Sequence, residues 1–225
     1  QGRIMTLETT SLQLLPVESA HVIRNPGSDL DLDWIAAAHG NLSAIERRAS
    51  SLPARRSIKK DWQAAWLIKA IECIDLTTLS GDDTPARVRR LCAKAKAPLR
   101  ADLIEALGLQ DRKIHTGAVC VYHDMIETAV GALEGSGIPV AAVSTGFPAG
   151  LSPHALKVKE IEASVAAGAA EIDIVITRRH VLGGDWQALY AEMRDYRAAC
   201  GDAHVKAILA TGELGTMRNI ARASR

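Results

Sequence analysis

Aromatic residues, net charge and long apolar runs are all scarce in this sequence. Aromatic side chains make up 4% of the 225 residues and the formal net charge is +1, so neither a base-stacking surface nor a field that attracts nucleic acid or an acidic membrane is expected. No apolar run approaches the roughly 18 residues that a membrane-spanning helix needs, and the N-terminus lacks the apolar core of a secretory signal. These absences predict a cytoplasmic protein with no nucleic-acid or membrane partner.

Motifs that mark cofactor or metal sites are also missing. The four cysteines form no CxxC pair, so free buried thiols of a cytosolic protein are favoured over a disulfide or metal role. No GxGxxG, P-loop, HExxH or GxSxG segment occurs, so nucleotide binding, metal-assisted hydrolysis and a serine triad find no support. We therefore expect neither a cofactor nor a metal ion. The cysteines are Cys73, Cys92, Cys120 and Cys200.

What the sequence does contain is a repeated strand–helix pattern. Residues 1–70 are predicted to form a polar helical extension. Residues 71–225 are predicted to begin a second domain, in which short β-branched runs alternate with amphipathic helices. Such alternation is typical of a parallel sheet with right-handed crossovers. The five predicted strands are 71–79, 116–122, 137–144, 171–176 and 204–210.

Ionisable residues in the middle of these strands favour a closed barrel over an open sheet. Asp75, Asp173 and Lys206 each lie within a predicted strand, and Cys120 lies within another. Both faces of an open parallel sheet are covered by helices, where an ionisable side chain is costly. In a barrel, one face of every strand points to a common interior, where these groups can pair and face a ligand. Each residue alone is compatible with a structural role, but two acids and an amine on like-oriented strands indicate chemistry.

Several segments, in order along the chain, closely resemble the deoxyribose-phosphate aldolase family. The resemblance extends from Asp29 to the last residue and looks like the eukaryotic-type branch, because the upstream segment KKDWQAAWLIKAIE also resembles that branch's helical lead-in. The segments are CIDLTTLSGDDT (73–84), AVCVY (118–122), GFPAG (146–150), EIDIVI (171–176) and KAILATGELGT (206–216).

The resemblance implies a (β/α)₈ TIM barrel of class I aldolase type, of which this chain would hold roughly the first five β/α units behind its N-terminal helical extension. It implies reversible cleavage of 2-deoxy-D-ribose 5-phosphate to glyceraldehyde 3-phosphate and acetaldehyde, in deoxyribose catabolism, through a lysine Schiff base and without a metal. Asp173 matches the family's proton-relay aspartate. Asp75, Cys120 and Lys206 match positions that line the same pocket. The expected partner is a phosphosugar substrate, and a homo-oligomer is compatible with these expectations.

The chain departs from the family pattern in two ways. In the family, the Schiff-base lysine lies in a Phe-Ile-Lys-Thr-Ser segment, and no such segment occurs before Arg225. Lys206 does not match that position. We therefore expect a C-terminally incomplete barrel that lacks cleavage activity on its own. In addition, His123 stands where the family usually has proline, in a loop near the barrel mouth.

Two other interpretations stay open. One is a non-catalytic truncated isoform that binds full-length subunits. The other is an open-sheet protein that binds a small molecule and carries this set of residues by coincidence. Strand order separates the barrel from the open sheet, because a barrel fragment keeps its strands adjacent in chain order, whereas a flavodoxin-like sheet places the second strand at an edge.

Overall fold

The computed structural model describes residues 27–55 and 57–225. The chain divides into two compact units, residues 1–30 and 31–225, and what is described of the first is irregular backbone. Part of the predicted extension of residues 1–70 lies outside the described residues, and its boundary with the barrel domain stays a prediction.

Three helices precede the sheet. They are α1 (Leu32–Ala36), α2 (Leu42–Ser51) and α3 (Lys60–Glu72). The first two begin at capping side chains, because Asp31 accepts a hydrogen bond from the Trp34 N–H at 2.9 Å and Asn41 accepts one from the Ala44 N–H at 3.0 Å. These bonds satisfy amides that a helix start leaves unpaired. The described part of residues 27–72 thus contains three helical segments, while its assignment as a separate extension stays a prediction. No helix in that part of the chain, or in the rest of the described residues, is long and apolar enough to cross a membrane.

The first strand begins later than the sequence predicted. Helix α3 continues through Glu72, so β1 is Asp75–Thr77 and does not start at Ile71. The helix formers that precede Ile71 propagate the helix through it, because extending an existing helix is easier than nucleating new structure. Cys73 consequently caps a helix and is exposed, which corrects the expectation that all four cysteines are buried. The other three are buried, and all four are free thiols.

Four further strands alternate with helices after β1. This confirms the predicted alternation and adds a short helix, α8, that the sequence did not lead us to expect. The elements are α4 (Pro85–Lys96), α5 (Ala101–Ala106), β2 (Ala118–Val121), the 3₁₀ helix η1 (His123–Met125), α6 (Ile126–Leu133), β3 (Val140–Ser144), α7 (His154–Ala166), β4 (Glu171–Val175), α8 (Arg178–Gly183), α9 (Trp186–Ala199), β5 (His204–Ile208), the 3₁₀ helix η2 (Thr211–Glu213) and α10 (Met217–Ala223).

The five strands form one parallel sheet in the order β1-β2-β3-β4-β5. Each strand pairs with its neighbours in chain order, so the flavodoxin-like open sheet is excluded and the strand order of a barrel is confirmed. The register places Thr77 beside Cys120, and Asp173 beside both Val143 and Lys206. Residues in register on adjacent parallel strands share a face, so these side chains belong to one side of the sheet.

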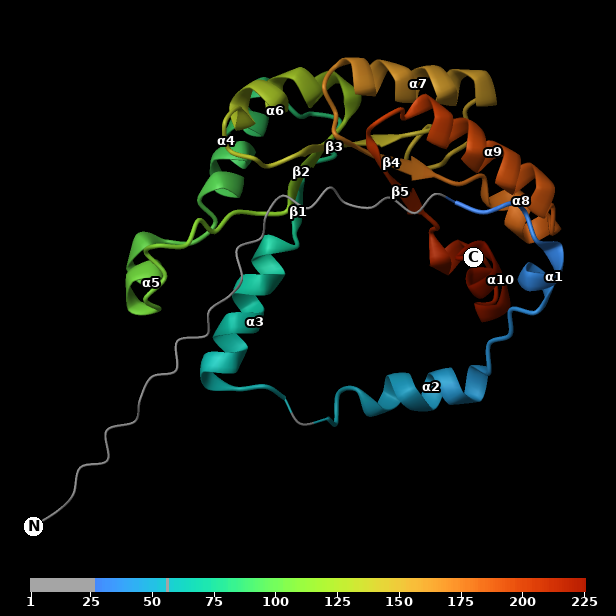
Figure 1. The fold of residues 1–225 in the computed structure, drawn as a ribbon, viewed down its shortest axis with the longest axis horizontal. Helices are drawn as coiled ribbons and strands as arrows, with labels where there is room; N and C mark the ends of the chain where they lie inside the picture. Colours follow the sequence, from blue (N-terminus) through green and yellow to red (C-terminus); the bar gives the residue numbers. More distant parts are fainter. Residues whose placement is uncertain (1–26, 56) are drawn as a thin grey trace, which may run out of the picture. The chain divides into compact units, whose positions relative to one another are not determined.

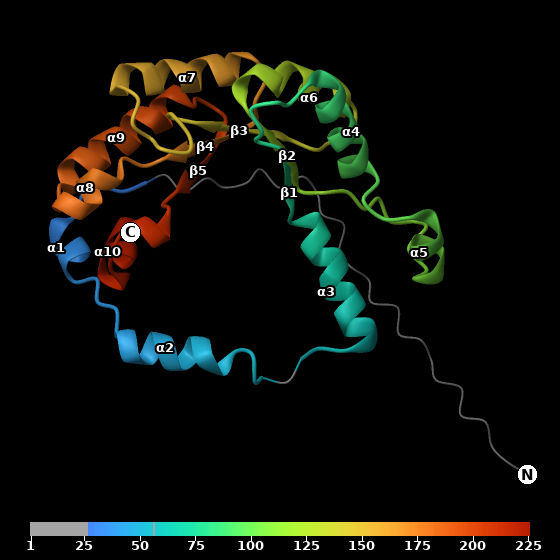
Figure 2. The ribbon, with the colours of Figure 1, turned by 180° about the vertical axis from the view of Figure 1, so that it is seen from behind.

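The two faces of the sheet are packed differently. On one face, alternate strand residues such as Val119 and Ile172 join the main hydrophobic core with residues of α4, α6, α7 and α9. These helices lie along one side of the strands in both views (Figures 1 and 2). The opposite face carries a smaller group that we call the interior cluster. The interior cluster consists of the buried residues Ala118, Cys120, Ala141 and Val143.

Gly150, in the loop after β3, is expected to tolerate no side chain. Its φ is +69°, and a Cβ atom there would lie 2.9 Å from Val175 Cγ1. Gly135 has the same φ but open space around its Cβ position. Gly150→Ala should therefore destabilise the protein by about 1–3 kcal/mol more than Gly135→Ala, because both share the left-handed strain but only the first adds overpacking. Urea unfolding of the two variants measures the difference, and equal losses would contradict it.

Candidate active site

A cluster of charged side chains gathers on the face of the sheet opposite the helices. The Lys206 ammonium lies 2.9 Å from Glu171 Oε2 and 3.2 Å from Asp173 Oδ1, and it also pairs with Asp75. The Cys120 thiol donates a hydrogen bond to the other carboxylate oxygen of Asp173, Oδ2, at 3.8 Å. The structure therefore brings together all four residues that the sequence singled out, while their chemical roles stay a prediction.

Glu171 was not among the predicted site residues. It precedes Asp173 by two positions on β4, and residues two apart on a strand point to the same face. The spacing in the sequence therefore indicates that Glu171 lies on the same face as Asp173. What the sequence does not show is that Lys206 on the neighbouring strand reaches both carboxylates.

The pairing of Lys206 with Asp75 shows that the sheet is curved. Their strands, β5 and β1, are the two outer strands of the sheet. Four inter-strand spacings of about 4.8 Å would hold these strands about 19 Å apart in a flat sheet. A lysine and an aspartate side chain do not span that distance together, so the sheet must curl toward the face that carries them, as barrel strands do. The charged cluster therefore lies on a concave interior surface.

Partial burial shapes the electrostatics of the cluster. The side chain of Asp173 is 14% exposed, and this burial raises the pKa of its carboxyl, which the Lys206 charge lowers only in part. Burial also disfavours the charge on Lys206, but hydrogen bonds to Asp75 and Glu171 and the nearby Asp173 carboxylate outweigh it, so the pKa of Lys206 is raised. Burial, together with the Asp173 charge, raises the pKa of Cys120 to about 12.

These shifts define what the cluster can do chemically. A carboxyl group with a raised pKa can take up and return a proton during a reaction, which is the role that Asp173 could have. Lys206 stays an ammonium and Cys120 stays a thiol, so neither is prepared to act as a nucleophile. Within residues 27–55 and 57–225, no three His, Cys, Asp or Glu side chains are arranged as metal ligands. The arrangement supports proton transfer to a bound small molecule.

Aromatic side chains border the interior cluster. Phe147, from the loop after β3, and Tyr122, at the end of β2, both pack against it, and their rings meet edge to face with centroids 6.0 Å apart. Both residues follow the carboxyl ends of their strands, which is where ligands bind in parallel barrels. They therefore form part of a wall at the mouth of the interior.

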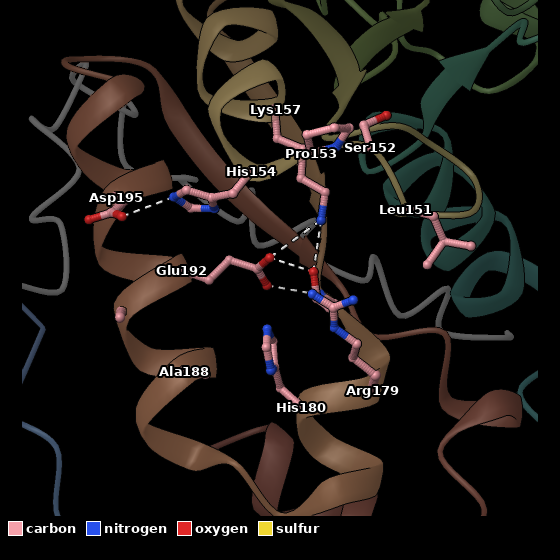
Figure 3. A pocket seen from close by; sticks show the side chains of 12 residues that line it. Leu151, Ser152, Pro153, His154, Lys157, Arg179, His180, Ala188, Glu192 and Asp195 are labelled. Carbon is pink, nitrogen blue, oxygen red and sulfur yellow. Dashed lines mark hydrogen bonds and ion pairs between the residues drawn. The ribbon is translucent and has the colours of Figure 1, made fainter.

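A separate cavity of about 420 Å³ lies among α7, α8 and α9 (Figure 3). Lys157 Nζ donates to Thr177 Oγ1 at 2.7 Å, and Glu192 accepts from the Thr177 N–H at 2.9 Å. The Tyr196 hydroxyl donates to Glu192 at 2.8 Å. These polar groups satisfy one another, so we assign them to stability and not to catalysis. Sequence analysis singled out none of them, because lysine and glutamate on helices usually face solvent.

Comparisons with known proteins point to an aldolase. The model of a family described as "DeoC/LacD family aldolase" matches residues 69–224. The deoxyribose-phosphate aldolase of Homo sapiens is 54% identical over 208 residues, which make up 92% of this chain and 64% of the human protein. That of Mus musculus is 56% identical over 200 residues, 88% of this chain and 63% of the mouse protein. The chain thus spans just under two thirds of the length of these relatives.

Solved structures share the fold. A candidate deoxyribose-phosphate aldolase from Coccidioides immitis superposes with a TM-score of 0.60 at 24% identity, covering 86% of this chain and 67% of that one. Another, from Toxoplasma gondii, superposes with a TM-score of 0.57 at 20% identity, covering 72% of this chain and 57% of that one. At such identities the likeness concerns the fold alone, and it agrees with a partial (β/α)₈ barrel.

Proposed function

The chain belongs to the DeoC/LacD family of aldolases, and from this premise we propose that the protein containing it is a deoxyribose-phosphate aldolase. The proposed reaction is the reversible cleavage of 2-deoxy-D-ribose 5-phosphate to glyceraldehyde 3-phosphate and acetaldehyde. The observation that carries this proposal is the half-buried cluster around Lys206, which places the raised-pKa carboxyl of Asp173 on the concave face of the sheet. We take the substrate from the names of the relatives described above.

The chemistry divides between an electron sink and a proton carrier. A lysine amine condenses with the C1 aldehyde of the sugar and releases water, which leaves a protonated imine. The C3 hydroxyl loses its proton as the C2–C3 bond breaks, and the bonding electrons move into the imine to give an enamine. Glyceraldehyde 3-phosphate leaves, C2 gains a proton, and hydrolysis of the imine releases acetaldehyde. We assign Asp173 to the proton transfers, with Asp75, Cys120 and Lys206 in its support.

Lys206 does not serve as the imine-forming lysine in this proposal. Three carboxylates hold its side chain as an ammonium, and an amine must be unprotonated to attack a carbonyl. By the family resemblance, the imine-forming lysine lies in a Phe-Ile-Lys-Thr-Ser segment, which does not occur in residues 1–225. The expectation that these residues alone do not cleave the sugar therefore stays part of the proposal. The alternative of a non-catalytic partner of full-length subunits, and any self-association, also stay predictions.

The test of this function is an assay of the complete protein with 2-deoxy-D-ribose 5-phosphate. Acetaldehyde is measured through its reduction by alcohol dehydrogenase and NADH. Ribose 5-phosphate is the matched control substrate, because aldol cleavage at its C2–C3 bond would give glycolaldehyde and no acetaldehyde. Absence of acetaldehyde from the deoxy sugar would reject the proposal.

Lys206→Met is expected to shift the pH dependence of the reaction. Burial raises the pKa of Asp173 and Lys206 opposes that rise, so removing the ammonium should raise this pKa further. Because Asp173 must be ionised to accept a proton, the acidic limb of the kcat/KM profile should move to higher pH. Lys159→Met, at an exposed position on α7, is the control and should leave the profile in place. An unmoved acidic limb in Lys206→Met would contradict the electrostatic role.

A further inference from the structure

His123 is held by two residues of helix α7. Its Nδ1 lies 2.9 Å from Ser164 Oγ, and its Nε2 lies 2.6 Å from Glu160 Oε1. The Ser164 hydroxyl also donates to the Glu160 carbonyl oxygen at 2.9 Å. Since a carboxylate only accepts, Nε2–H is the donor to Glu160. Both nitrogens of the His123 ring are therefore held by α7.

The second oxygen of Glu160 reaches the loop after β3. Glu160 Oε2 accepts from the Gly146 N–H at 2.9 Å. The preceding residue, Thr145, is tied to β4, because its hydroxyl donates to the Val175 carbonyl at 2.9 Å and accepts from the Val175 N–H at 2.6 Å. Residues 145–150, which we call the mouth loop, are thus anchored at their start by β4 and by Glu160, and Glu160 is in turn fixed by His123.

The mouth loop carries Phe147 to the interior face. Phe147 packs against the interior cluster, and one member of that cluster, Cys120, lies 3.8 Å from the Asp173 carboxylate. A change in the position of the mouth loop therefore changes the wall beside the proposed substrate site. The polar partners of the His123 ring are on α7 and not in the charged cluster around Lys206.

We propose that His123 is a positioning residue, which acts through Glu160 to hold the mouth loop and thereby sets how well the phosphosugar fits at the barrel mouth. The proposal rests on the proposed function and deepens it. Proline or alanine at this position would have no side-chain donor for Glu160, so the histidine adds a restraint on Gly146 that those residues would lack. Because the restraint acts on the wall of the proposed substrate site and not on the reacting atoms, it should govern KM more than kcat.

The kinetic test compares His123→Ala, His123→Pro and His123→Gln in the complete protein. His123→Ala and His123→Pro should each raise KM for 2-deoxy-D-ribose 5-phosphate about 3- to 10-fold, the effect of one lost hydrogen bond, with kcat within about twofold of wild type. His123→Gln keeps an N–H donor and should recover part of the loss. Adding His123→Ala to Glu160→Gln should cost little beyond Glu160→Gln alone, because both act through one chain of contacts.

His154→Ala is the matched control. His154 is the first residue of α7 and also pairs with a carboxylate, that of Asp195, at 3.0 Å, but this pair borders the separate cavity on the helix side of the sheet. Its loss should leave KM unchanged. A second readout does not depend on activity: hydrogen exchange of the Gly146 amide should speed up in His123→Ala and stay as in wild type in His154→Ala.

The outcomes separate this inference from the proposed function. Wild-type protein that produces no acetaldehyde would reject the aldolase assignment, while Gly146 exchange would still test the restraint. Unchanged KM and unchanged Gly146 exchange in His123→Ala and His123→Pro would overturn the inference. A fall in kcat with KM unaltered would also overturn it, because it would place His123 in the chemical step.

Discussion

Asp173→Asn is expected to lower kcat for cleavage of 2-deoxy-D-ribose 5-phosphate by about 10²- to 10⁴-fold, the contribution of a positioned general acid–base group. Asparagine has nearly the same shape, so binding should change less than turnover. The amide cannot take up the C3 hydroxyl proton or return a proton to C2. Steady-state kinetics of the complete protein measures both parameters, and Asp102→Asn, an exposed aspartate on α5, is the control that should retain wild-type kcat.

The same substitution should not lower the stability of the fold. Burial raises the folded-state pKa of Asp173 above its ordinary value. A group shifted in this direction contributes stability below its unfolded-state pKa and loses that contribution as pH rises through the folded-state pKa. At neutral pH the ionised carboxylate is therefore a net cost, and Asp173→Asn should melt at or above the wild-type temperature. A large loss of both activity and stability would mean that Asp173 is structural.

Lys157→Met is expected to have the largest effect on stability, a loss of about 3–5 kcal/mol, because removing one partner of a buried ion pair leaves the other charge uncompensated. The side chains of Lys157 and Glu192 are only 3% and 6% exposed, and their charged atoms lie 3.4 Å apart. Urea unfolding measures the loss. Lys159→Met removes an exposed lysine two residues away on the same helix and should change the free energy of unfolding little.

Two further measurements identify the cause of that loss. Adding Glu192→Gln to Lys157→Met should restore part of the stability, because the uncompensated charge of Glu192 is removed.

Burial opposes ionisation of Glu192, but hydrogen bonds from Thr177 and Tyr196 and the Lys157 charge outweigh it and lower the pKa of Glu192. Its contribution is present above the unfolded-state pKa and is lost as pH falls below the ordinary value of 4.5. Glu192→Gln should therefore flatten the stability–pH curve in that acidic range, and an equally steep curve would count against the network.

The network around Glu192 has a structural link to the proposed chemistry. Thr177 follows β4 closely, and both its N–H and its hydroxyl donate to Glu192. The carboxyl end of the strand that carries Asp173 is thus fixed from the helix side, while Lys206 holds Asp173 from the interior side. Precise placement of a proton-transfer group depends on such rigid support.

Local patterns in the sequence were sufficient to predict the strand–helix alternation and to predict that the charged residues share one face of the sheet. A strand has a period of two, so the alternation in EIDIVI is enough to assign Asp173 to the face opposite the core isoleucines of that strand. The same period assigns Lys206 to the face opposite Val205 and Leu209, which pack against the core. Family motifs then gave Asp173 its proposed role. Element ends were less certain, as the late start of β1 shows, because helix propagation and strand propensity compete there.

Only the tertiary structure could decide which of these groups meet. Lys206 reaches Asp75 because the sheet curls. This curvature accumulates over five strands, and the sequence of no single strand indicates it. The Lys157–Glu192 pair and the chain from His123 through Glu160 to Gly146 join residues 14 to 37 positions apart. Such contacts depend on how helices pack against the sheet. The sequence around a charged helix residue does not show whether its side chain is solvated or buried with a partner.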